Sequence, residues 1–309
     1  MKEKNILNAW SLVTEFHSLK KLNFVPALFG TAWLVLVLTY QVIFALVFLL
    51  GWQDSALKVI IDFLHQDYVV LVVTTVSIIF FGFIILHAIS IGGIIEMMDS
   101  YKKNNKSLLH RSWQGFFDGL SHFLPMFEIQ NMTAIFHPVT IITFYIFLLR
   151  IFGDGFFWLI TIIMSVYLVF SFLVNIFISY APFCVVLENK RGIASLSAST
   201  EMAFRNIGIT TRLYFTNFLL YFRVILVGGA FLLLPFVIVT GLTFFTVAFA
   251  KITFLIVLGI VSVILFIFIT HLNSTLEIFV YALWHEAYIT CKENDLLRKE
   301  EQEKLESTF

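Results

Sequence analysis

Charged residues are scarce in this chain, making up 13% of its 309 residues, whereas soluble globular proteins carry about a quarter. Hydrophobic residues make up 60% of the chain, and phenylalanine alone occurs 37 times. A chain with so few polar groups cannot cover a folded surface in water, but it can in lipid. This scarcity excludes an ordinary soluble domain and predicts a membrane protein.

Further absences narrow the function. The net charge is zero, so the chain lacks the basic field that nucleic-acid binding needs. The two cysteines, Cys184 and Cys291, are far apart in sequence and both predicted near the cytoplasmic face, so we expect reduced thiols and no structural disulfide. The pair His285-Glu286 lacks the second histidine of a zinc protease, and neither a phosphate-binding loop nor a nucleophile elbow occurs. We therefore expect no enzyme, no metal and no cofactor.

The chain has long apolar runs instead. A helix needs about 20 apolar residues to cross about 30 Å of hydrocarbon, and six segments meet this length. Backbone groups in lipid must bond within the segment, and the runs lack the alternation of membrane-spanning strands. We therefore predict an all-α, polytopic membrane protein with six transmembrane helices in residues 25–284. The predicted spans are about 25–52, 68–95, 134–152, 156–187, 213–240 and 252–284.

Lysine and arginine indicate the orientation of these spans. From the N-terminal segment through the five loops to the tail, their number alternates 4-1-4-1-4-1-4. Because these residues concentrate in cytoplasmic loops, the alternation supports six crossings. It also predicts that both termini are cytoplasmic.

Cytoplasmic segments before alternate spans predict amphipathic interfacial helices. The first lies in residues 1–24, where large apolar residues recur at helical spacing at Ile6, Leu7, Trp10, Val13, Phe16 and Leu19. The second is the run LLHRSWQGFFDGLSHFLPMF, and the third is Ile193–Asn206. Each precedes a pair of spans, which gives a weak threefold periodicity over 5–95, 107–187 and 190–284. The charged cytoplasmic tail, 285–309, is predicted to be either a solvated helix or disordered.

Proline and glycine mark the expected turns. Pro26 is predicted at the first turn of span 1, where a missing N–H costs nothing. Residues 53–67 are predicted to be a short acidic loop, and Gly153–Gly155 a tight loop that makes spans 3 and 4 a hairpin. In span 5, a kink or a close helix contact is indicated by Gly228, Gly229 and Pro235.

The stretch Tyr180–Arg212, YAPFCVVLENKRGIASLSASTEMAFRNIGITTR, interrupts the apolar runs. A turn is expected at Glu188–Gly192, followed by the helix Ile193–Asn206 and a stop at Gly208. The stretch carries a spaced motif of five residues: Pro182, Glu188, Gly192, Ser195 and Ser199.

This motif resembles a broad group of prokaryotic six-span membrane proteins of unknown function. The group includes the YciC-like proteins and the membrane domain fused to some glycerophosphodiester phosphodiesterases. The resemblance implies a six-span fold in a prokaryotic cytoplasmic (inner) membrane. It implies no reaction, because no polar segment of the chain is long enough for a phosphodiesterase domain.

Some polar residues fall inside the predicted spans, where a charge costs at least about 2.5 kcal/mol. Arg223 lies 11 residues beyond Arg212, and Glu277 lies 8 residues before His285. At about 1.5 Å per helical residue, the two reach similar depths. We predict an intramembrane polar layer made of Arg223, Glu277, Asn273, Asn175 and His87. Hydrogen bonding between helices is the favoured interpretation, and an ion or ligand site is the alternative.

These features leave functions of different classes. The favoured one is a non-enzymatic integral membrane protein that acts in assembly, as a scaffold, or in lipid or protein interaction. Its expected partners are membrane lipids, other membrane proteins or a second copy of itself, and not nucleic acid. The alternative is a transporter or channel that uses the polar layer and the interrupted span 5. An intramembrane lipid-modifying enzyme is the least favoured.

Overall fold

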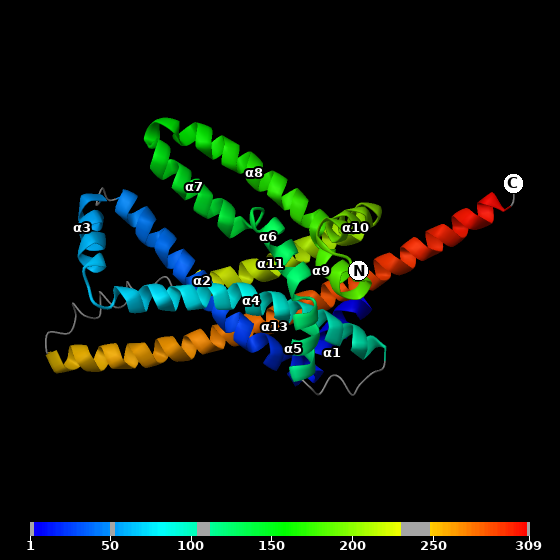
Figure 1. Ribbon diagram of the computed structural model, residues 1–309, viewed down its shortest axis with the longest axis horizontal. Helices are drawn as coiled ribbons and strands as arrows, with labels where there is room; N and C mark the ends of the chain where they lie inside the picture. The colour runs from blue at the N-terminus through cyan, green and yellow to red at the C-terminus, as the bar shows by residue number, and fades with distance from the viewer. Residues whose placement is uncertain (1–2, 50–52, 104–111, 230–247, 308–309) are drawn as a thin grey trace. The chain divides into compact units, whose positions relative to one another are not determined.

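The computed structural model describes residues 3–49, 53–103, 112–229 and 248–307, and every regular element in these ranges is a helix (Figure 1). The all-α prediction is therefore confirmed. The longer helices are α2 (His17–Leu49), α4 (Val69–Lys102), α8 (Phe157–Ile178), α11 (Ile207–Gly229) and α13 (Ala248–Glu306). The shorter ones are α1 (Glu3–Glu15), α3 (Gln53–Leu64), α5 (Ser112–Ser121), α6 (Phe123–Ala134), α7 (Pro138–Phe152), η2 (Asp154–Phe156), α9 (Ala181–Glu188) and α10 (Gly192–Arg205).

Four described stretches are long and apolar enough to cross a membrane: His17–Gln41, Val69–Lys102, Phe157–Glu188 and Ile252–Glu306. A fifth results if α6 and α7, which bend by 42° at the break between them, make one span. The chain is thus a membrane-embedded protein with four or five candidate spans among its described residues. The predicted count of six is not confirmed. Part of predicted span 5, including Pro235, lies outside the described residues.

The N-terminal half differs from the sequence prediction in two places. Span 1 starts earlier than residue 25, because α1 ends at Glu15 and α2 begins at His17. Pro26 therefore lies inside α2 and not in its first turn, and the predicted helix over residues 5–23 is divided at Phe16. A long apolar helix tolerates the loss of the single backbone hydrogen bond that the proline cannot donate.

Residues 53–67 are also not a simple loop. Most of this segment is the helix α3, QDSALKVIIDFL. The apolar residues Ile60, Ile61 and Leu64 recur at helical spacing among good helix formers, and this pattern outweighs the acidic residues from which a loop was predicted.

The described helices form two compact units. Unit 1 comprises Met1–Asn23, Ile84–Phe215 and Ile278–Phe309, and unit 2 comprises Phe24–Phe83 and Thr216–Glu277. The helices α2, α4, α11 and α13 each contribute a part to both units.

Unit 2 has its large apolar side chains mostly outside and small or polar ones inside. Glycines bring α2 and α4 together, since Gly30 contacts Phe83 and Gly82 faces the ring of Phe29. Among the described residues, its buried side chains are Pro26, Ala27, Thr31, Gln41, Asn217, Thr270 and Ser274. This inside-out distribution is expected of helices that face lipid.

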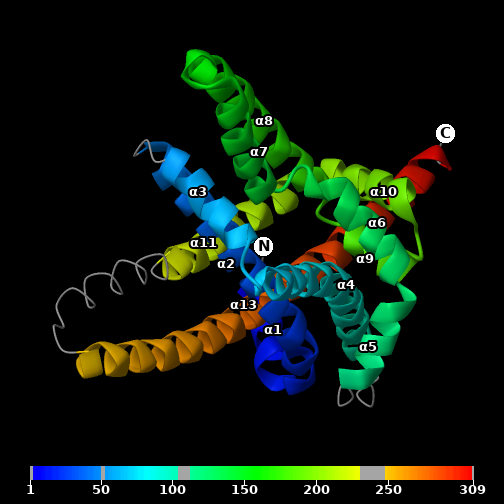
Figure 2. The same cartoon turned by 60° about the vertical axis from the view of Figure 1, so that its left-hand side comes forward.

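Unit 1 contains the hairpin of α7 and α8, which run side by side in both views (Figures 1 and 2). Between these two helices, Ile141, Ile160 and Met164 form a buried cluster. The chain reverses at Gly153, whose φ of 66° favours glycine. The predicted hairpin is therefore confirmed.

The C-terminal helix α13 runs without a break for 59 residues, from Ala248 to Glu306. Of the two alternatives for the tail, the helical one is correct as far as Glu306. Between Ile278 and Cys291, α13 is largely buried within unit 1. This burial extends beyond residue 284, where the predicted span ends, and the sequence did not predict it.

Candidate functional site at the Glu188 junction

The Glu188 junction is the part of unit 1 where α9, the turn after it and α10 meet α13. It comprises the five motif residues together with Tyr180, Lys190, Tyr288 and Lys292. The sequence motif from which a family resemblance was inferred is thus gathered in one place. The following contacts indicate what each of its residues does.

Pro182 and Ser199 stabilise the break between α8 and α9. Pro182 lies in the first turn of α9, where its missing N–H is not needed. The backbone N–H of Tyr180 donates to Ser199 Oγ (3.0 Å), and Ser199 Oγ donates to the carbonyl of Phe177 (2.8 Å). A single buried hydroxyl therefore bonds two backbone groups that the break leaves without helical partners.

The turn between α9 and α10 depends on backbone conformations that few residues adopt. Asn189 is left-handed at φ 53°, and the N–H of Lys190 donates to the carbonyl of Cys184 (3.2 Å). Gly192 has a φ of 45°, and a Cβ at this position would lie 2.5 Å from Glu128 Oε1 on α6. The buried Ser195 donates to the carbonyl of Gly192 (2.6 Å). The predicted turn at Glu188–Gly192 is confirmed, and α10 begins one residue earlier than predicted.

Glu188 accepts from three donors, and two of them, Tyr288 and Lys292, join this turn to α13. Lys190 Nζ lies 2.8 Å from Oε2, Lys292 Nζ lies 2.8 Å from Oε1, and the Tyr288 hydroxyl donates to Oε1 (2.6 Å). The Glu188 side chain is only 14% exposed, whereas both lysine side chains are more than 40% exposed. The hydrogen bond to Glu188, with its charge, raises the pKa of Lys190. Both carboxylate oxygens are engaged, so this geometry suits a structural ion pair.

An aromatic layer lies beside the carboxylate. The ring of Tyr180 packs edge-on against Trp284, and Phe183 stacks on Tyr288 at 5.6 Å between ring centroids. The Tyr180 hydroxyl contacts Thr210 Oγ1 (3.2 Å) and Cys291 Sγ (3.6 Å). Both cysteines are buried and free, as expected for reduced thiols.

Further along α13, polar contacts hold the end of α10. Asn206, which ends α10, is bonded by Asn294 and Asp295, and Arg298 donates to the carbonyl of Arg205 (3.1 Å). Gly208 is therefore not a helix stop, because α11 already begins at Ile207.

The same unit exposes bulky apolar side chains on its short helices. On α10 these are Ile193 (71% exposed) and Phe204 (72%), with Ile207 at the start of α11. On α1 they include Leu7 and Trp10. The motif side chains and the aromatic layer of the junction are thus buried or half-buried, while Ile193, Phe204 and Ile207 beside them are exposed.

The predicted polar layer is divided between the units. His87 and Asn175 belong to unit 1, whereas Arg223, Asn273 and Glu277 belong to unit 2. Asn175 donates to the carbonyl of Phe136 (2.8 Å), at the break between α6 and α7. Asn273 donates to Thr31 Oγ1 (3.5 Å). The Arg223 side chain lies outside what the structure describes, so the layer as a whole stays a prediction.

Sequence reasoning named Asn273 but missed other uncharged polar residues inside unit 2. The side chains of Asn217 and Thr270 are buried, and their polar atoms have no hydrogen-bond partner among the described residues. Thr270 and Ser274 lie one turn apart on α13. A signal was present, because hydroxyl and amide residues recur inside apolar runs, but the predicted layer took only Asn273 and Asn175 from among them.

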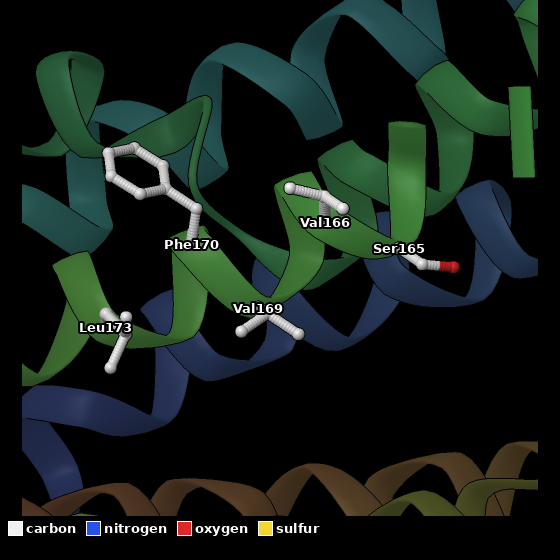
Figure 3. Close-up of a pocket in the computed structure, with 5 residues that line it drawn as sticks. All are labelled: Ser165, Val166, Val169, Phe170 and Leu173. Atoms are coloured by element: carbon white, nitrogen blue, oxygen red, sulfur yellow. The ribbon is translucent and has the colours of Figure 1, made fainter. Parts of the chain in front are cut away.

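An open groove of about 390 Å³ lies along one face of α8 in unit 1 (Figure 3). It is lined by Ser165, Val166, Val169, Phe170 and Leu173. Its almost wholly apolar lining suits a lipid chain better than a polar ligand. In the described ranges, no three metal-ligating side chains come together.

Comparison of the chain with protein-family profiles, with curated proteins and with solved structures finds no match.

Proposed function

We propose that this chain is a non-enzymatic integral membrane protein whose unit 1 is a rigid platform for assembly with neighbouring membrane proteins or lipids. The observation that carries the proposal is the division of side chains in unit 1. The motif residues make contacts within the unit, while α1, α5 and α10 expose bulky apolar residues. Internal contacts keep such a platform from deforming, and exposed apolar residues give it a surface that neighbours can contact.

The proposed setting is a prokaryotic cytoplasmic membrane, with six crossings and both termini in the cytoplasm. The alternation of lysine and arginine along the chain supports this topology. The resemblance of the motif to YciC-like membrane proteins supports the setting. On this topology, unit 1 includes the cytoplasmic ends of the spans.

A photo-cross-linking experiment tests the platform. A benzophenone amino acid in place of Phe204, on the exposed face of α10, should give adducts with membrane proteins or lipids in intact membranes. The matched control is Leu305, which is 62% exposed on the charged end of α13 and should give few adducts. Equal adduct yields at the two positions would contradict the proposal, because contact would then follow exposure alone.

The second candidate is a transporter or channel, and the interior of unit 2 favours it. Asn217 and Thr270 are buried with polar atoms that lack described partners, as expected of a lining that binds water or a polar solute. Purified protein in liposomes should then pass small polar solutes, and Asn217→Leu should abolish this flux. Absence of flux for ions and small solutes alike would eliminate this candidate.

A further inference from the structure

The helix α5 is held against α4 by glycines. Gly115 and Gly119, one turn apart on α5, are both buried. A Cβ at Gly119 would overlap the carbonyl of Ile89, and one at Gly93 would overlap the carbonyl of Gly115. The two backbones are therefore in direct contact, and α5 has no freedom to turn its other face toward α4.

The opposite face of α5 carries a stripe of large apolar residues. It consists of Trp113 (76% exposed), Phe117 (61%), Leu120 (46%) and, after the one-residue break at His122, Leu124 (73%). The spacings of four, three and four residues follow the helical repeat. We call these four residues the α5 stripe. About half or more of each of these residues is exposed.

The position of the contact along α4 gives the depth of the α5 stripe. Twenty residues from Val69 reach Ala88, and a helix of that length spans about 30 Å, the thickness of the hydrocarbon. Exposed apolar residues continue along α4 as far as Ile85, whereas Ala88–Ile95 is buried. The contact with α5 begins at Ile89. A hydrocarbon layer that begins at Val69 would therefore end where this contact begins, at the boundary between acyl chains and headgroups.

The charges of this segment distinguish between kinds of membrane contact. Residues 112–134 contain Asp118 and Glu128 and no lysine or arginine. These residues therefore supply no attraction to anionic lipid of the kind that adds to the binding of basic interfacial helices, and the nearest basic residue is Arg111, just before α5. The remaining driving force is burial of the apolar side chains between lipids, which is sensitive to lipid packing.

We propose that the α5 stripe is inserted into the headgroup–acyl boundary of one leaflet, and that lipid packing rather than lipid charge governs its insertion. This inference rests on the proposed function, because it names lipid as the neighbour of one face of unit 1. The glycine contact holds α5 at one position along α4, so the α5 stripe stays at a constant, shallow depth in the leaflet.

Quenching of tryptophan emission by brominated phosphatidylcholine tests the proposal on the full chain in vesicles. The emission of Trp113 is isolated as the difference between the wild-type protein and Trp113→Phe. Most of this emission should be lost with bromines near the headgroup, and less with bromines near the chain ends. Loosely packed lipids should increase the quenching, whereas phosphatidylglycerol or high salt should leave it unchanged.

Two tryptophans provide controls. Trp284→Phe removes a side chain that is 7% exposed in unit 1, and its difference signal should resist quenching. Trp158→Phe removes one that is 75% exposed on α8, so its signal should be quenched as that of a lipid-facing residue is. An unquenched, red-shifted Trp113 signal would overturn the proposal in favour of water. An unquenched, blue-shifted signal would overturn it in favour of a second copy or another protein. If adducts still form at Phe204 in either case, the proposed function stands without this inference.

Discussion

Substitution of Gly192 by alanine probes the turn that joins α9 to α10. The change adds one Cβ to a residue with a φ of 45°, where the nearest atom would be Oε1 of Glu128 at 2.5 Å. Gly192 is buried beneath that carboxylate. The turn sets the direction of α10 and brings Glu188 to α13, so its strain is felt by the whole junction.

Three effects determine the magnitude. A left-handed conformation costs a residue with a Cβ about 1–2 kcal/mol relative to glycine. Glu128 is exposed and can move aside, but it then leaves the positive N-terminal end of α10, where a carboxylate contributes about 0.3–1 kcal/mol. Alanine also restricts the unfolded chain, which returns about 0.4–1 kcal/mol. The free energy of unfolding should therefore fall by about 1–2 kcal/mol.

The measurement is denaturant unfolding of the detergent-solubilised protein, followed by tryptophan emission. Gly208→Ala is the matched control, because Gly208 lies in the first turn of α11 with no atom within 4 Å of an added Cβ. That change should stabilise the helix by about 0.5–1 kcal/mol. In the background Glu128→Ala, the cost of Gly192→Ala should shrink by the part due to the carboxylate. Equal effects of the two glycine substitutions would refute the assignment of strain to Gly192.

Three other changes test separate parts of the structure in the same unfolding assay. Glu188→Gln removes the charge and replaces one acceptor oxygen by an NH2 group, so the bonds to Tyr288 and Lys292 can be kept but the one to Lys190 is lost; it should cost only about 1 kcal/mol, since both lysine partners are well exposed. The folded pKa of Lys190 is raised above 10.5, so the contribution of its ion pair to the free energy of unfolding is complete below pH 10.5. The difference in this free energy between the wild type and Glu188→Gln should therefore narrow as the pH rises through the raised pKa. Asn217→Leu should stabilise the protein by about 1–3 kcal/mol, since it removes buried groups without described partners. A loss of stability there would point to a solvated interior. Gly119→Ala should cost about 1–3 kcal/mol by overpacking α5 on α4. Gly155→Ala, with open space around it, should change little, and a similar cost at both sites would contradict the close contact.

The sequence predicted the features that depend on local chemistry. Apolar runs predicted the helices, Gly153 the reversal of the hairpin, and the cluster Glu188–Gly192 the turn before α10. Each of these follows from residues that are close in the chain. The helical tail was one of two predicted alternatives, because its charged residues are good helix formers but have no evident packing partner in the sequence.

The features that the sequence did not predict depend on residues distant in the chain. The three donors of Glu188 include Tyr288 and Lys292, about 100 residues away, and no local pattern indicates this pairing. The helix breaks at Tyr180, inside what the sequence shows as one apolar run. The hydroxyl that stabilises this break belongs to Ser199, which is 19 residues further along the chain. Pro26 was predicted at a helix start from local chemistry alone, but the long helix α2 continues through the missing hydrogen bond.

The unbroken course of α13 gives it residues in both units. A helix of 59 residues is about 88 Å long at 1.5 Å per residue. Thr270 and Ser274, inside unit 2, are on the same rod as Tyr288 and Lys292, which hold Glu188 in unit 1. No glycine or proline interrupts the rod between them. One continuous helix therefore supplies both the hydroxyl groups inside unit 2 and the tyrosine and lysine that hold Glu188 in unit 1.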